Sequence, residues 1–126
     1  MPTDRDAYRL ERTFRGRRPT ITVLCGSTRF GEHFRAANLR LTLAGHIVLT
    51  IGCDTKSDAE LDAAASLGYD TTVTKAELDE LHKRKIDLAD EVLILNVGGY
   101  IGESTRGEIG YAELIGKPIS FLEGDA

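Results

Sequence analysis

The chain has 126 residues and a formal net charge of −4, with 41% hydrophobic and 29% charged residues. This length fits one compact domain with a single core, and no apolar run is long enough to cross a bilayer. The negative charge disfavours nucleic-acid binding, which needs clustered Lys and Arg at the phosphates. Only Cys25 and Cys53 are present, and the amino end lacks a secretory pattern, so we expect a cytoplasmic protein with two free thiols.

Residues 1–19 are dense in charge and lack a sustained apolar period. We expect them to form a charged N-terminal arm, ahead of a single α/β domain over residues 20–126. An alternative is that the arginines of this arm contact a ligand phosphate or a second subunit.

The first half of the domain alternates strand and helix signals. The β-branched run at 21–24 predicts a buried strand, apolar residues at helical spacing over 30–41 predict a helix that stops at Gly45, and residues 47–51 predict a second strand. Ser57-x-x-Glu60 is a capping box that opens a helix closing at Gly68.

The second half continues the alternation. Thr74-x-x-Glu77 opens a helix that ends near 89–90, and a strand follows at 92–96. Thr105-x-x-Glu108 predicts the start of the last helix, Gly116 its end, and 118–122 a final strand. Right-handed crossovers between such elements predict an α/β, three-layer, Rossmann- or flavodoxin-like fold, with a parallel sheet of four to five strands and helices on both faces.

Ligands of such sheets bind beyond the carboxyl ends of the strands, and the loop after the first strand has suitable chemistry. Gly26 permits close backbone approach, while Ser27, Thr28 and Arg29 offer donors at a helix N-terminus, where a phosphate or a ribose hydroxyl fits. The alternative is an ordinary turn in which Ser27 or Thr28 caps the helix. Dinucleotide and P-loop motifs are absent, so we expect no cofactor, and we expect no metal.

A second loop follows the strand at 92–96. It combines glycines, hydroxyls, an aromatic ring, an arginine and two carboxylates. Its candidate binding residues are Gly98, Gly99, Tyr100, Gly102, Ser104, Thr105 and Arg106. Glu108 is expected in the first turn of the last helix, where the helix dipole favours the ionised carboxylate of a nucleophile. The capping box with Thr105 is an equal alternative for this side chain. Tyr100 is either a stacking platform for a base or a cover for the sheet edge.

Two segments carry a resemblance to a known family. Residues 25–29, Cys-Gly-Ser-Thr-Arg, and residues 107–112, Gly-Glu-Ile-Gly-Tyr-Ala, followed by Gly-Lys-Pro at 116–118, resemble the nucleoside 2-deoxyribosyltransferase superfamily, including its deoxynucleoside 5'-monophosphate N-glycosidase branch. The likeness covers about residues 20–123. It implies cleavage of an N-glycosidic bond in a nucleoside or nucleoside 5'-monophosphate and, because small members complete their sites across subunits, a homodimer.

The resemblance assigns roles to single residues. Glu108 takes the place of the glutamate that attacks the anomeric carbon, as in retaining glycoside hydrolysis, and Ser27, Thr28 and Arg29 take the place of the loop that grips the 5'-phosphate. The family's second acidic residue lies about two turns before an Ala-Asp pair, where this chain has His82. We expect the proton donor to be His82 or Asp79, and His82 as a solvent-facing helix residue is an alternative.

Two further interpretations remain. The Cys-Gly-Ser-Thr opening and the Ser-Thr-x-x-Glu spacing at 104–108 are also similar to cytokinin-activating phosphoribohydrolases of the lysine-decarboxylase-like group, although only part of their signature is present. The other interpretation is a module that senses a nucleotide-like ligand without cleaving it. In every case the expected partner is a small-molecule nucleoside or nucleotide, with no nucleic acid and no membrane.

Overall fold

The computed structural model describes residues 17–51 and 58–124. Four predictions from the sequence fall wholly or partly outside this range: the arm up to residue 16, the free thiol of Cys53, the capping box of Ser57 and Glu60, and the end of the chain at 125–126. None of the helices within the described ranges combines the length and the apolar character needed to cross a lipid bilayer.

The domain is built on a sheet of four parallel strands in the order β2-β1-β3-β4. The strands are β1 (Ile21–Cys25), β2 (Ile47–Leu49), β3 (Glu91–Ile94) and β4 (Ile119–Phe121). Val23 pairs with Leu49 on one side and with Val92 on the other, which places β1 in the interior of the sheet. The predicted α/β class and the parallel sheet of four to five strands are confirmed.

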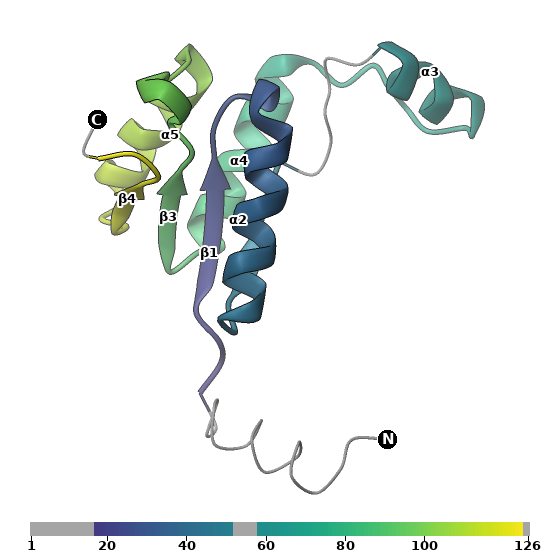
Figure 1. Ribbon diagram of the computed structural model, residues 1–126. Coiled ribbons are helices and arrows are strands. Elements are labelled where there is room, and N and C mark those ends of the chain that lie inside the picture. Colours follow the sequence, from purple (N-terminus) through teal and green to yellow (C-terminus); the bar gives the residue numbers. More distant parts are fainter. Residues whose placement is uncertain (1–16, 52–57, 125–126) are drawn as a thin grey trace, which may run out of the picture.

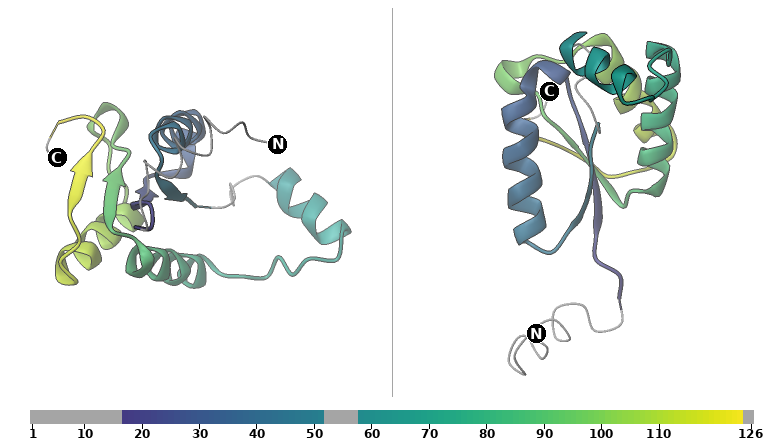
Figure 2. Two further views of the ribbon diagram at one scale, coloured as in Figure 1. Left: turned by 90° about the horizontal axis from the view of Figure 1, so that it is seen from below. Right: turned by 90° about the vertical axis from the view of Figure 1, so that its right-hand side faces the viewer.

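Helices cover both faces of this sheet (Figures 1 and 2), as the sequence predicts for a three-layer Rossmann- or flavodoxin-like fold. Helix α2 (Gly31–Leu43) packs on one face, and α4 (Lys75–Leu88) and α5 (Glu103–Leu114) pack on the other. Helix α3 (Asp58–Ser66) lies between β2 and α4 in the chain, and short 3-10 turns, η1 (Thr28–Phe30) and η2 (Val97–Gly99), follow β1 and β3.

Alternation along the strands creates two apolar cores. Leu24 and Leu93 point to the α2 face, where Phe34, Ala37 and Leu41 meet them. The strand residues that alternate with these leucines point to the opposite face, where they pack against helices α4 and α5. This second core contains Val23, Cys25, Ile86, Ala89, Val92, Ile94 and Ala112. Cys25 therefore faces α4 and α5 because it follows Val23 by two positions.

The start of β3 is fixed by a polar contact at Asp90. One carboxylate oxygen of Asp90 accepts a hydrogen bond from the Ile21 backbone N–H at 2.8 Å, and the Arg18 guanidinium donates to both oxygens at 2.5 and 2.7 Å. These contacts hold the pKa of Asp90 well below its usual range, with the hydrogen bond from Arg18 as the largest cause. Arg18, one of the residues 17–19 of the predicted arm that the structure describes, thus contacts the domain.

Two boundaries differ from the prediction. Strand β2 ends at Leu49, two residues before the predicted Ile51. Helix α5 begins at Glu103 rather than at Thr105, with Gly102 as its N-cap. The predicted capping box of Thr105 and Glu108 is therefore wrong, because both residues lie inside the helix. At the start of α4, Thr74 is the N-cap as expected, and its hydroxyl accepts a hydrogen bond from the Glu77 backbone N–H at 3.2 Å.

Candidate functional site

A cavity of about 710 Å³ lies beside the carboxyl ends of β1 and β3. The strand order reverses between these two strands, and ligands of open α/β sheets bind at such a switch point. Ten of the fourteen residues that the sequence predicts for a site line this cavity: Gly26, Ser27, Thr28, Asp79, His82, Tyr100, Gly102, Ser104, Thr105 and Glu108. The volume suits a nucleoside-sized ligand.

The loop after β1 forms the floor of the cavity. Ser27 caps the short turn η1, its hydroxyl accepting from the Arg29 backbone N–H at 3.3 Å, whereas α2 itself has Phe30 as its N-cap, without a side-chain hydrogen bond. The Thr28 hydroxyl is buried and has no hydrogen-bond partner among the described residues. Thr28 is therefore a side chain of this loop that lines the cavity and whose buried hydroxyl lacks a partner within the described part of the chain.

The close approach at Gly26 is made by the protein itself. A Cβ at this position would lie 3.1 Å from the Leu95 Cβ and 3.4 Å from the Phe34 Cζ. From the sequence we predict that Gly26 lets a ligand approach the backbone. In the structure the space beside Gly26 is instead filled by Leu95 and Phe34, so the glycine allows the loop to pack closely against the protein.

Glu108 lies in the middle of α5 and is 6% exposed at the cavity wall. The expectation that the first helical turn keeps this carboxylate ionised is wrong, because α5 begins five residues earlier. Burial raises the pKa of Glu108 to about 7, and the charge of Asp79 adds to that rise, while the Cys25 thiol and the Lys75 ammonium act in the opposite direction. One carboxylate oxygen, Oε2, is buried without a hydrogen-bond partner among the described residues.

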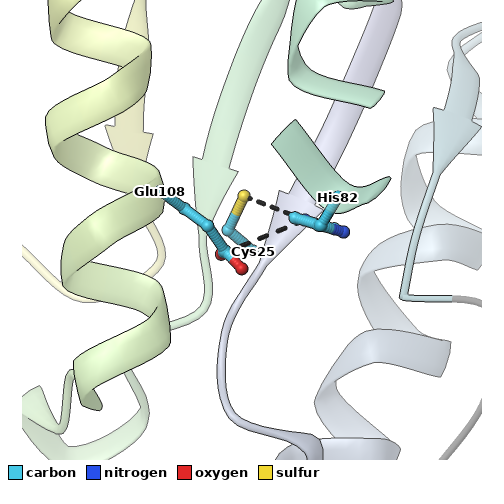
Figure 3. A group of neighbouring side chains, drawn as sticks. All are labelled: Cys25, His82 and Glu108. Atoms are coloured by element: carbon cyan, nitrogen blue, oxygen red, sulfur yellow. Dashed lines mark hydrogen bonds and ion pairs between the residues drawn. The ribbon is translucent and has the colours of Figure 1, made fainter. Parts of the chain in front are cut away.

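His82 faces Glu108 from α4 (Figure 3). Its Nε2 lies 3.3 Å from the Cys25 Sγ and 4.0 Å from the Glu108 Oε2. The side chain is 5% exposed, which contradicts the alternative of a solvent-facing helix residue. Burial lowers the pKa of His82 to about 4, and the charge of Lys85 contributes in the same direction.

Asp79 lies one turn before His82 on α4 and is 39% exposed at the side chain. Its Oδ2 accepts hydrogen bonds from Lys75 Nζ at 3.2 Å and from Ser104 Oγ at 3.4 Å. Lys75 also donates to Ser104 at 2.5 Å, so these polar groups connect the N-terminal ends of α4 and α5 at the cavity.

Four of the predicted site residues do not line the cavity: Arg29, Gly98, Gly99 and Arg106. Gly98 and Gly99 have φ of 63° and 80°, and shape the turn after β3, and Arg106 is exposed on α5. The Arg29 guanidinium lies 4.1 Å from the centre of the Tyr100 ring and donates to the Tyr100 hydroxyl at 3.2 Å. Arg29 thus holds Tyr100, which itself lines the cavity.

Cys25 and Lys75 contact the candidate residues but were not predicted from the sequence as site residues. Cys25 is the first residue of the predicted loop at 25–29 and the last residue of β1, and its position in the alternation of β1 indicates which face it occupies. Lys75 follows the N-cap Thr74 and precedes Asp79 by four residues, a spacing that brings helical side chains together.

Comparison of the sequence with models of known protein families gives no match, and comparison with curated proteins gives none either.

Proposed function

We propose that the protein cleaves the N-glycosidic bond of a nucleoside or nucleoside 5'-monophosphate, as an N-glycosidase or a deoxyribosyltransferase, with Glu108 as the nucleophile. The observation that carries the proposal is the Glu108 carboxylate, buried at the wall of a nucleoside-sized cavity at the sheet's switch point. The resemblance of the segments at 25–29 and 107–112 to the nucleoside 2-deoxyribosyltransferase superfamily supports the same reaction.

In this mechanism a Glu108 oxygen forms a bond to the anomeric carbon of the sugar. The bond from that carbon to the base breaks, and its electron pair leaves with the base, which takes up a proton. Water or a second base then attacks the same carbon and releases the carboxylate. The product keeps the original anomeric configuration, because two inversions follow each other.

Asp79 is the group that we assign to the proton transfer. Its half-exposed side chain lies at the cavity, where the base of a bound ligand can reach it, whereas the His82 Nε2 is directed towards Cys25 and Glu108. Thr28, with its unpartnered hydroxyl, and Tyr100, held by Arg29, are the side chains that we assign to the ligand.

The test is base release from a panel of ribo- and deoxyribonucleosides and their 5'-monophosphates, followed by chromatography. We expect turnover of at least one member and a fall of at least about 10³-fold in Glu108→Gln. Glu113→Gln is the matched control, since Glu113 is an exposed carboxylate on the same helix and outside the cavity. No turnover with any member, or equal turnover in Glu108→Gln and wild type, contradicts the proposal. Turnover restricted to ribonucleoside 5'-monophosphates favours the phosphoribohydrolase alternative.

A ligand-sensing module is the second candidate. The observation in its favour is that a buried imidazole, His82, lies next to Glu108, where the superfamily resemblance leads us to expect an acidic residue. Calorimetry of the same panel, with the ligand recovered afterwards and checked by chromatography, separates the two functions. Tight binding of a ligand that is recovered intact supports the sensor and contradicts catalysis.

A further inference from the structure

Three side chains of types that can bind metal ions come from three separate elements and lie close together at the cavity (Figure 3). Cys25 comes from the end of β1, His82 from α4 and Glu108 from α5. Their exposed fractions are 0%, 5% and 6%. The Cys25 Sγ, the His82 Nε2 and a Glu108 carboxylate oxygen all lie within 4.8 Å of one another.

Hydrogen bonding within the cluster leaves one group without a partner. Cys25 and Glu108 both approach the same ring nitrogen, at 3.3 Å and 4.0 Å, and a neutral imidazole nitrogen either donates one hydrogen bond or accepts one. The Glu108 Oε2 has no hydrogen-bond partner within the described residues. Buried polar atoms without a partner are rare in native proteins, and an ion is one of the accepted explanations.

The arrangement also differs from a catalytic relay of thiol, imidazole and carboxylate. In such a relay the nucleophile and the acid contact opposite nitrogens of the ring, so that the imidazole passes a proton between them. Here both partners face Nε2. Three lone-pair donors gathered within 4.8 Å of one another are instead an arrangement suited to a metal ion.

The donor set and the spacing fit one class of cation. Thiolate, imidazole and carboxylate are the three ligand types of zinc, and the thiolate selects against Mg²⁺ and Ca²⁺. Bonds of roughly 2.0–2.3 Å in a tetrahedral site put neighbouring ligand atoms about 3.3–3.7 Å apart. The His82 Nε2 lies 3.3 and 4.0 Å from the other two ligand atoms, and all three lie within 4.8 Å of one another, so side-chain shifts of about 1 Å bring them into this range.

We propose that Cys25, His82 and Glu108 bind one thiophilic divalent cation, with Zn²⁺ as the representative, and that its fourth coordination position opens to the cavity. His82 and Glu108 both line that cavity, and three protein ligands with one open position are typical of an exchangeable or reactive zinc site. Binding releases the thiol proton of Cys25 to solvent. The sequence-based expectation of no metal is replaced by this proposal, which does not depend on the glycosidase proposal.

The test is a titration of the full chain, freed of metal by a chelator and kept reduced, with Co²⁺ as a spectroscopic substitute for Zn²⁺. We expect a thiolate-to-cobalt charge-transfer band that saturates at one equivalent and disappears when Zn²⁺ is added. Cys25→Ser must abolish the band. Cys53→Ser is the matched control and must retain it, because these are the two cysteines of the chain.

Glu108→Gln guards against a folding artefact, since it keeps the size of the side chain and removes one ligand. We expect Co²⁺ affinity to fall by more than about tenfold, with an unchanged far-ultraviolet circular dichroism spectrum. Absence of the band in folded wild type, or a band that depends on Cys53 instead of Cys25, overturns the proposal. Because this titration contains no nucleoside, it succeeds or fails independently of the base-release assay.

Discussion

Substitution of Gly26 by alanine tests how the loop after β1 is held against β3. The new methyl group would lie 3.1 Å from the Leu95 Cβ and 3.2 Å from the Leu95 carbonyl oxygen. These atoms cannot retreat freely, since the Leu95 N–H donates to the Cys25 carbonyl at 2.8 Å. Overpacking of this kind costs about 1–3 kcal/mol, and the reduced entropy of the unfolded chain returns about 0.4–1 kcal/mol. The expected net loss is about 1–2 kcal/mol.

The control for this substitution is Gly110→Ala. Gly110 lies within α5, and a Cβ there would meet nothing within 4 Å, so alanine should stabilise the protein by about 0.5–1 kcal/mol. Urea unfolding of both variants, with the slope m unchanged from wild type, gives the two free energies. If Gly26→Ala were as stable as wild type while Gly110→Ala gained stability, the close packing at Gly26 would have no energetic weight and the argument would be refuted.

Three further predictions concern the scaffold. Ile86→Ala removes a fully buried side chain between α4 and the sheet, and should lower the free energy of unfolding by about 2–5 kcal/mol in urea titrations. Asn96→Ala removes two hydrogen bonds of 2.9 Å to the backbone of Glu123; we expect faster amide exchange at Glu123 and a loss of about 1–3 kcal/mol, and unchanged exchange would contradict this. The pKa of Asp90 is depressed by Arg18, so its stabilisation is complete above the unfolded pKa of about 3.9 and is lost as the pH falls further. Thermal midpoints should therefore fall more steeply below about pH 4 in wild type than in Asp90→Asn, and equal slopes would exclude this contribution.

The sheet and the layers could be predicted from the sequence because the local signals agree with one another. Apolar, β-branched runs mark β1 and β3, and helical spacing with a glycine stop marks α2. The predicted start of α5, at Thr105, is wrong for a physical reason. Ser104, Thr105 and Glu108 have the composition of a capping box, but Gly102 and the acidic Glu103 provide another start that suits the positive helix end.

The convergence beneath the cavity could be predicted only in part. Alternation along β1 puts Cys25 on the same face as Val23, and spacing along α4 puts His82 on the same side as Ile86. The sequence alone does not predict that α4 and α5 cover the same face of the sheet. It also does not predict how far each helix is shifted along its own axis relative to the other. Those two facts decide whether His82 meets Glu108, and both depend on packing between distant elements.

The two proposals assign Glu108 different tasks, and the same atoms cannot perform both at once. Attack on a sugar needs a carboxylate oxygen free towards the cavity, whereas zinc would hold that oxygen beside the His82 Nε2 and the Cys25 Sγ. If both proposals hold, zinc must inhibit base release. At substrate concentrations well below KM, half-inhibition must then occur at the zinc concentration that half-saturates the metal site, because one binding event produces both effects. Inhibition that persists at the same concentration in a folded Cys25→Ser variant would show that zinc acts elsewhere.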